Sequence, residues 1–274
     1  IGEPTTEEEL REIGEDGVLA LVCDSTNVFN PEASGSEGAV FKGLLEQVQS
    51  WPDRRVVVTT FASNVARLHT LGEIAKETGR EVVIAGRSLD RIIEVARDNG
   101  YLDDFPDVVD WNTAMGLPRG EVLIMATGGQ GEPRAALNRM AIDASPYFEL
   151  EAGDTVIFSS IVIPGNEKAV ERLLEKLRKK GVEVVLSEDS DVPIHASGHP
   201  CVEELKLMYQ WTKPQIAIPV HGEPEHLEAH AAVAREMGVK RTYVGRNGDL
   251  YLLAPQPGIR RARVKAGRLA IDQS

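Results

Sequence analysis

Short runs of apolar and β-branched residues recur along the chain and predict buried strands. Most are followed by segments whose apolar residues stand three and four positions apart, as in Val170, Leu173, Leu174 and Leu177, which is typical of a helix with one buried face. Strands that alternate with helices in this way predict an α/β fold with a largely parallel sheet flanked by helices. The predicted strands are residues 18–23, 56–61, 82–85, 122–126, 155–159, 182–186, 216–220 and 250–253.

Two charged stretches predict where a helix ends and where the last domain gives way to a linker. Residues 168–181 end in Lys-Lys-Gly, which favours the solvated end of a helix closed by a left-handed glycine. Residues 255–274 contain Pro255, Pro257 and Gly258, then five basic residues from Arg260 to Arg268, without periodicity. That last stretch predicts a linker.

Composition excludes several classes of protein. The 274 residues carry 30 Lys+Arg against 43 Asp+Glu, a net charge of −13, which argues against attachment to nucleic acid by the overall field but is compatible with a local basic channel. A hydrophobic fraction of 42 % excludes disorder as the main state. No apolar run approaches the ~18 residues of a membrane span, and the acidic residues 3–9 are unlike a signal peptide, so neither a membrane-bound nor an exported protein is expected. With only Cys23 and Cys201, the chain predicts no disulfide framework and a cytoplasmic location.

Five of the six histidines fall within residues 195–230. His221 follows the strand 216–220, and Asp24 follows the strand 18–23, so both are expected at carboxyl ends of strands, where α/β sheets bind ligands. A carboxylate and an imidazole there suit zinc or manganese. The alternative for Asp24 is a turn-forming role, because Asp-Ser-Thr-Asn is rich in residues that bond their own backbone.

The segment His195-Ala-Ser-Gly-His199 places a glycine and a serine at a predicted helix start, which is typical of an anion site. A simple helix cap with a solvent-facing histidine is the alternative. His226 and His230 stand four apart on one helix face, but no glutamate directly follows the first, as it does in the zinc-protease motif. Solvated or packing roles are therefore favoured for both.

Glycine-rich and small polar loops follow several predicted strands. Thr127-Gly-Gly-Gln-Gly-Glu-Pro133 has the position of a phosphate-cradling loop, without the lysine of a Walker loop. Residues 61–64 and 163–167 add further polar strand ends. Together these loops predict a phosphate-rich ligand, whereas each alone is compatible with an ordinary βα turn.

Motifs in chain order over about residues 17–254 resemble the ribonuclease J family. The resemblance implies a metallo-β-lactamase-like domain with an inserted β-CASP domain, and an RNA-degrading and RNA-maturing enzyme that acts as a 5′–3′ exonuclease and an endonuclease with two metal ions. The motifs are Cys-Asp24-Ser-Thr-Asn, Ser-Glu37, Thr-Phe-Ala-Ser-Asn64, Ala-Gly-Arg-Ser88, Gly-Gly-Gln-Gly-Glu-Pro133, Ile-Pro-Gly-Asn-Glu167, Ser-Gly-His199, Glu-Glu-Leu-Lys206 and Pro-Val-His-Gly-Glu223.

The resemblance also implies roles for single residues. Asp24 resembles the carboxylate that bridges the metals, and His221 the last metal-binding histidine. His199 resembles the catalytic histidine that faces the scissile phosphate, and Glu37 the acid that orients it. The implied RNA phosphate pocket contains His195, Ser197 and His199, with Ser63, Asn64, Gly128, Gly129, Gln130 and Gly131 near the same cleft.

One departure limits the resemblance: the family's His-x-His-x-Asp-His motif is absent, as is the metal-binding histidine that precedes the Asp24 region. Catalytic zinc usually takes three protein ligands, so Asp24 and His221 alone predict an incomplete site for the two zinc ions, or manganese, of the full protein. The chain is therefore interpreted as a fragment. Its predicted parts are the lactamase-like core at 1–38 and 184–255, the β-CASP domain at 39–183 and a linker at 256–274.

We expect the isolated chain to bind zinc weakly or not at all and to lack nuclease activity, but to retain affinity for phosphate-bearing ligands. RNA is the expected partner, with Arg87, Arg134, Arg139 and the basic stretch after Gly258 as candidate contacts. No membrane partner is expected, and a homo-oligomer is compatible with the sequence.

Two other hypotheses stay open: a metal-free nucleotide- or RNA-binding α/β module, and a scaffold that contributes an oligomer interface. The fragment interpretation predicts that strands 18–23 and 216–220 are neighbours in one sheet.

Overall fold

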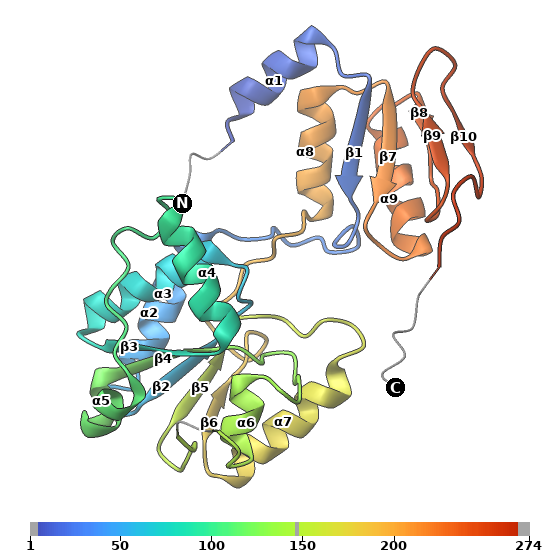
Figure 1. Ribbon diagram of the computed structural model, residues 1–274. Helices are drawn as coiled ribbons and strands as arrows, with labels where there is room; N and C mark the ends of the chain where they lie inside the picture. Colours follow the sequence, from blue (N-terminus) through green and yellow to red (C-terminus); the bar gives the residue numbers. More distant parts are fainter. Residues whose placement is uncertain (1–4, 146–147, 268–274) are drawn as a thin grey trace. The chain divides into compact units, whose positions relative to one another are not determined.

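The computed structural model describes residues 5–145 and 148–267, which divide into two compact units (Figure 1). Unit 1 contains Gly35–Ala196. Unit 2 combines Glu3–Ser34 with Ser197–Ser274, so unit 1 is an insertion in the chain of unit 2. None of the described helices is both long and apolar enough to cross a membrane.

Unit 1 is built on a five-stranded sheet in which every pairing is parallel, in the order β3-β4-β2-β5-β6. The central strands are buried along their whole length because helices cover both faces, which is why they appear in the sequence as unbroken apolar runs. The strands are β2 (Val56–Thr59), β3 (Glu81–Ala85), β4 (Val122–Ala126), β5 (Thr155–Phe158) and β6 (Glu183–Val185).

The helices of unit 1 pack in two layers (Figure 1). One face of the sheet is covered by α2 (Glu37–Gln49), α3 (Val65–Thr78) and α4 (Arg87–Asp98). The other face is covered by α5 (Trp111–Gly116), α6 (Ala136–Ala141) and α7 (Glu167–Lys179), and the turn η1 (Arg119–Glu121) precedes β4. The predicted helix at 168–181 is confirmed, with its four leucine and valine positions buried and Gly181 in the left-handed region at φ 73°.

Unit 2 contains a three-stranded parallel sheet in the order β1-β7-β8. β1 pairs with β7 from Ala20 opposite Ile216 to Asp24 opposite Val220, which confirms that strands far apart in the sequence are neighbours. The elements are α1 (Glu7–Asp16), β1 (Ala20–Asp24), α8 (Val202–Thr212), β7 (Ile216–Val220), α9 (Pro224–Glu236), β8 (Arg241–Thr242), β9 (Leu250–Leu252) and β10 (Gly258–Arg260).

Two expectations need correction. The predicted buried runs 18–23 and 250–253 are not buried. β1 is an edge strand of the described sheet with Val22 59 % exposed, and Leu250 of β9 is 38 % exposed. The predicted linker 256–274 is ordered at its start, because Gly258–Arg260 pair antiparallel with β9 and Arg261 binds Asp249; residues 268–274 lie outside the described part.

The two compact units divide the chain at positions other than the predicted domain boundaries. The units divide at Ser34/Gly35 and Ala196/Ser197, whereas the expected domain boundaries were 38/39 and 183/184. β6 completes the sheet of unit 1, and the backbone of Pro193 approaches Gly43 of α2 so closely that a Cβ there would lie 2.2 Å from its carbonyl oxygen. The segment after β6 thus packs on unit 1 before the chain returns.

Candidate metal and phosphate site

Asp24, His199 and His221 come together in unit 2 at the carboxyl ends of β1 and β7. Asp24 Oδ2 lies 2.9 Å from His199 Nδ1 and 3.1 Å from His221 Nδ1. The two imidazole rings stack with centroids 5.3 Å apart. The pairing of β1 with β7 explains the meeting of Asp24 with His221, while His199 arrives from the segment before α8.

The turn after each strand is held by local contacts. Thr26 donates its N–H to Asp24 Oδ1 at 2.7 Å, and its hydroxyl donates to the His221 carbonyl at 3.0 Å. His221 takes a left-handed conformation with φ 58°, which is uncommon for a residue with a side chain and clusters at functional sites. Gly222 is required next to it, because a Cβ there would lie 2.8 Å from the Cβ of His226. The Thr26 hydroxyl therefore fixes the backbone that presents His221.

The pKa of Asp24 lies below its ordinary value. Partial burial raises it, but the N–H of Thr26 and the hydrogen bond with His199 lower it by more. Asp24 is thus a carboxylate at neutral pH, the form that binds a metal.

The donor set of this cluster fits one zinc ion. One carboxylate oxygen and two imidazole nitrogens lie within 4.8 Å of one another, and three protein ligands are the usual number in a catalytic zinc site. Among residues 5–145 and 148–267, no other group of three His, Cys, Asp or Glu side chains is so arranged. The sequence predicted Asp24 and His221 as metal ligands, and for that reason weak zinc binding or none. The third donor, His199, was predicted to face phosphate; with it in the cluster, we expect the chain to hold one zinc ion.

Ser197 is held directly beside this cluster. Its oxygen accepts hydrogen bonds from Asn27 Nδ2 at 2.9 Å and from the His199 N–H at 3.1 Å. Ser34 Oγ and Asn27 Nδ2 also bind the His199 carbonyl. With both acceptor positions of Ser197 used, its O–H remains to donate to an anion.

Glu37 and His195 belong to unit 1 and lie around Arg67. The Glu37 carboxylate accepts from Arg67 Nε at 2.7 Å and Nη2 at 3.1 Å, and from Thr70 Oγ1 at 2.9 Å. Partial burial raises the pKa of Glu37, but Arg67 and Thr70 lower it by more. Burial, and then the charge of Arg67, lower the pKa of His195. Arg67, whose side chain is fully buried, was missed in the sequence.

The predicted phosphate loop, residues 127–133, is largely buried within unit 1. Gly128, Gly129 and Gln130 are buried, and a Cβ on Gly131 would lie 2.4 Å from the backbone of Ala169 at the start of α7. The Gln130 side chain links the strand-end loops: it donates to Ile161 O and accepts from the N–H of Ile163. Its side chain is therefore committed to the fold, and Gly131 is required by packing.

The other predicted phosphate residues lie at the start of α3. Asn64 caps this helix, with its side-chain oxygen accepting from the Arg67 N–H at 3.0 Å, and Ser63 is exposed beside it. The structure thus divides the predicted phosphate set among the start of α3, the loop after β4 and the segment 195–199.

Two known protein domains match this chain. The model "Ribonuclease J, beta-CASP domain" matches residues 53–177, within unit 1, and the model "Zn-dependent metallo-hydrolase RNA specificity domain" matches residues 192–244. The chain is also 44 % identical to a ribonuclease J from Sinorhizobium meliloti over 94 % of its length. The chain belongs to the ribonuclease J family.

Two other ribonuclease J relatives also match nearly the whole length of the chain. Ribonuclease J2 from Bacillus subtilis is 35 % identical over 96 % of the chain, and ribonuclease J from Mycolicibacterium smegmatis is 38 % identical over 99 %. The alignments cover 45 %, 47 % and 49 % of the three relatives. The chain thus spans less than half the length of the curated relatives it matches. The α/β fold with its inserted β-CASP domain agrees with the family.

A buried polar triad of Ser25, Tyr209 and His230 packs next to this candidate metal site. His230 accepts or donates one hydrogen bond with Ser25 Oγ and one with Tyr209 OH, each 2.8 Å long, and its side chain is fully buried. Ser25 follows Asp24, and its N–H donates to the His221 carbonyl. The predicted packing role of His230 is confirmed, and His226 packs its ring against Phe29.

The triad predicts a dependence of stability on pH. Burial lowers the pKa of His230 to about 4, so between pH 6.5 and pH 4 the unfolded chain binds a proton that the folded chain does not. The contribution of neutral His230 to the free energy of unfolding is complete above pH 6.5. About 3 kcal/mol of it is lost as the pH falls to 4. Urea unfolding at both pH values should show this extra loss in the wild-type chain relative to His230→Gln. Equal losses in the two proteins would contradict the claim that folding keeps His230 neutral in this pH range.

Proposed function

We propose that this chain is part of a metal-dependent ribonuclease that hydrolyses RNA phosphodiesters, as a 5′–3′ exonuclease and an endonuclease, in RNA decay and maturation. The observation that carries the proposal is the cluster of Asp24, His199 and His221 at the strand ends of unit 2. In a chain of the ribonuclease J family, such a cluster is suited to metal-assisted phosphodiester hydrolysis.

Asp24, His199 and His221 would hold one ion, and the two ions of the complete enzyme, zinc or manganese, would need further ligands. A bound ion supplies Lewis acidity and lowers the pKa of water. As a ligand through Nδ1, which lies 2.9 Å from Asp24, His199 would have its Nε2–H left to donate a hydrogen bond to a phosphate oxygen of the RNA and so stabilise the charge that develops there. The Ser197 hydroxyl would donate to a phosphate oxygen of the RNA.

Glu37 would act on this segment indirectly. Arg67 binds Glu37 on one side and, through Nη1, the carbonyls of Ser159 at 3.0 Å and Ile194 at 3.5 Å on the other. Ile194 precedes His195, so the Glu37–Arg67 pair is suited to fix the start of segment 195–199. We assign Glu37 and Arg67 as positioning residues for His195.

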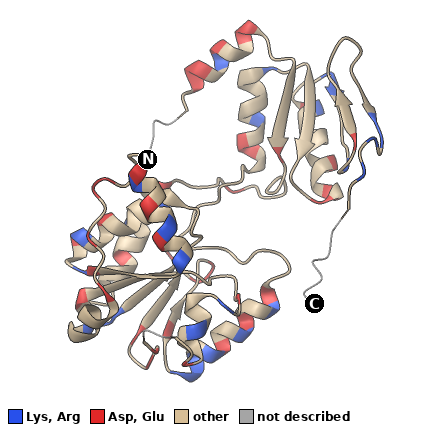
Figure 2. Ribbon diagram, viewed as in Figure 1, with Lys and Arg blue, Asp and Glu red and all other residues tan. Residues whose placement is uncertain are grey.

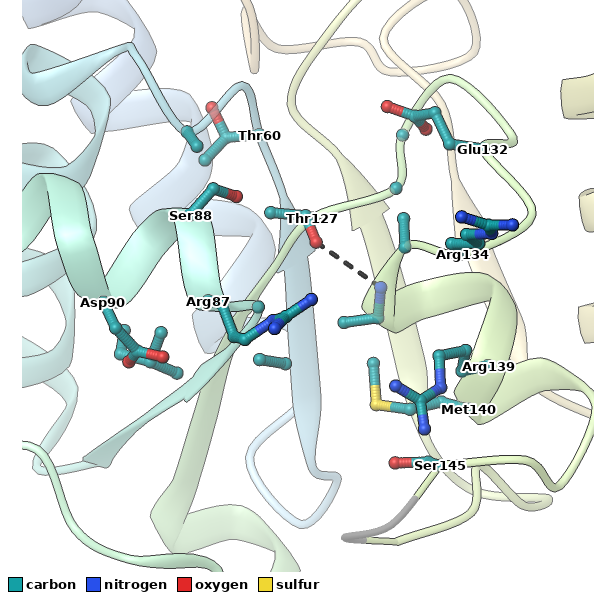
Figure 3. Close-up of a pocket in the computed structure, with 18 of the residues that line it drawn as sticks. Thr60, Arg87, Ser88, Asp90, Thr127, Glu132, Arg134, Arg139, Met140 and Ser145 are labelled. Carbon is teal, nitrogen blue, oxygen red and sulfur yellow. Dashed lines mark hydrogen bonds between the residues drawn. The ribbon is translucent and has the colours of Figure 1, made fainter. Parts of the chain in front are cut away.

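RNA would be held by local charge, because the chain is acidic overall. Figure 2 shows Lys and Arg on α4, α6 and α7 of unit 1. The proposed RNA contacts are Arg87, Arg134 and Arg139, which line a cavity in unit 1 (Figure 3), and the basic residues after Gly258.

The proposed location is the cytoplasm, where RNA decay and maturation occur in bacteria. Assembly into homo-oligomers is part of the same proposal.

A hybrid enzyme tests the ribonuclease function. The chain replaces the 257-residue segment that it matches in the Sinorhizobium meliloti relative, and RNA cleavage is measured with and without a metal chelator. We expect the hybrid to cleave RNA, the chelator to stop cleavage and the chain alone to be inert, because Asp24, His199 and His221 provide only part of a two-metal site. Cleavage by the hybrid that resists chelation would contradict the metal-dependent mechanism. Cleavage by the chain alone would contradict its expected inertness.

A further inference from the structure

Glu204, on the first turn of α8, binds two segments of unit 2 with one carboxylate group. Its Oε1 accepts a hydrogen bond from the N–H of Ser34 at 3.2 Å. Its Oε2 accepts from the Ser34 hydroxyl at 2.6 Å and from the N–H of Cys201 at 2.8 Å. Both carboxylate oxygens are therefore used, and they join the segment that ends at Ser34 to the start of α8.

The Glu204 side chain is ionised at neutral pH. Partial burial raises the pKa of Glu204, but the hydrogen bonds from Ser34 and Cys201 lower it by more, so this pKa lies below its ordinary value. Hydrogen bonds to a charged group are about twice as strong as those between neutral groups. The carboxylate therefore holds Ser34 more firmly than a neutral side chain of the same shape would.

These contacts enclose the turn that carries His199. The Ser34 carbonyl accepts from the N–H of Ser197 at 3.0 Å, two residues before His199. Cys201, whose N–H binds Glu204, follows two residues after His199. The Ser34 hydroxyl lies between Glu204 Oε2 and the His199 carbonyl, which is 2.8 Å away. One carboxylate thus acts on the turn at both of its ends.

The turn needs such support because it has little rigidity of its own. Residues 193–200 form neither helix nor strand, and a Cβ on Gly198 would meet no atom within 4 Å. The His199 side chain is 39 % exposed, so packing does not fix it on all sides. A ligand or hydrogen-bond donor must nevertheless be held close to its working geometry.

We propose that Glu204 is a positioning residue for His199, because it fixes the turn that places the His199 ring beside Asp24. The proposal rests on the function proposed above, which assigns His199 to the metal and to a phosphate oxygen of the RNA. The alternative is that Glu204 serves only the capping box of α8, through its bond from the N–H of Cys201.

Glu204→Gln separates these two roles. Glutamine is also found in capping boxes, so its one side-chain oxygen can keep the hydrogen bond from the N–H of Cys201. The amide nitrogen that replaces the second oxygen only donates, and it cannot accept from the N–H of Ser34. Glu203→Gln is the matched control, because Glu203 is the preceding residue of α8, is 63 % exposed and pairs with Lys206.

Hydrogen exchange of the metal-free chain, followed by NMR, tests the proposal. In Glu204→Gln, we expect the Ser197 N–H to exchange about 10- to 100-fold faster than in the wild type, which corresponds to the loss of a hydrogen bond to a charged group. Glu203→Gln should leave this rate unchanged, and amides of β7 should exchange equally slowly in all three proteins. A capping role alone affects only the first turn of α8, so an unchanged Ser197 rate in Glu204→Gln would overturn the proposal.

A second measurement connects the turn to the site. Glu204→Gln should weaken zinc binding by the chain, and lower kcat of the hybrid enzyme, by about 10-fold each, the usual effect of removing a group that orients a metal ligand. Glu203→Gln should change neither. Full zinc affinity together with full kcat in Glu204→Gln would overturn the proposal. The exchange rates are measured without metal or RNA, so failure of the ribonuclease function is distinguishable from failure of this proposal.

Discussion

Replacement of Arg67 by methionine should lower the free energy of unfolding by about 3–5 kcal/mol, the usual cost of removing one partner of a buried ion pair. The Arg67 side chain is 0 % exposed and its partner Glu37 is 31 % exposed. Methionine would keep most of the apolar stem but leave Glu37 without its cation and remove the Arg67 hydrogen bond to the Ser159 carbonyl. The Ile194 carbonyl would keep the Ser159 hydroxyl, which donates to it at 2.7 Å. Urea unfolding, followed by circular dichroism, measures the loss.

Lys76→Met on the same helix is the matched control, because Lys76 is 40 % exposed and its one ion pair within residues 5–145 and 148–267 is with Glu73, three residues earlier. It should change stability by less than about 0.5 kcal/mol. A double substitution of Glu37 and Arg67 by apolar residues should recover part of the Arg67→Met loss, since no charge is then left buried. A loss of less than 1 kcal/mol in Arg67→Met would show that the buried pair does not hold α2 to α3.

Substitution of His199 by alanine in the hybrid enzyme should lower kcat by about 10²–10³-fold, the usual cost of removing one hydrogen-bond donor that stabilises charge in the transition state. Its Nδ1 is fixed 2.9 Å from Asp24, and its carbonyl is held by Asn27 and Ser34, so the ring is pre-oriented before substrate binds. The readout is the initial rate of cleavage of a 5′-phosphorylated RNA at saturating substrate.

His226→Ala is the control for this experiment, because His226 belongs to the same unit but packs against Phe29 outside the cluster. It should retain the rate of the unsubstituted hybrid within a few fold. A His199→Ala hybrid as active as the His226→Ala hybrid would remove His199 from the catalytic machinery.

The sequence predicted those features that depend on local pattern. β2, β4 and β5 appear as unbroken apolar runs because both faces of their sheet are covered, and a strand end is visible wherever such a run meets a polar residue such as Asp24. The pairing of β1 with β7 followed from the family resemblance, since no local signal joins segments so far apart. β10 was missed because three residues after a proline-rich turn have no periodicity to detect.

The rest of the site depends on tertiary contacts. Arg67 has the appearance of an ordinary polar helix residue in the sequence, and only packing shows that it is fully buried against Glu37. The approach of His199 to Asp24 depends on how Asn27 and Ser34 hold the segment before α8. Asn27 and Ser34 were missed for the same reason, although Glu204, which binds Ser34, lies in a motif that the family resemblance includes.

Zinc binding by the chain tests the candidate metal site most directly. The purified protein is freed of metal and titrated with zinc at pH 7, and the stoichiometry and affinity are compared among the wild type, Asp24→Asn and His226→Ala. Three donors within 4.8 Å of one another predict one zinc ion per chain, an affinity reduced at least about 10-fold by Asp24→Asn, and no change in His226→Ala. Two tightly bound ions per chain, no binding at all, or one ion that Asp24→Asn retains at full affinity would contradict the assignment of Asp24, His199 and His221 as the metal site.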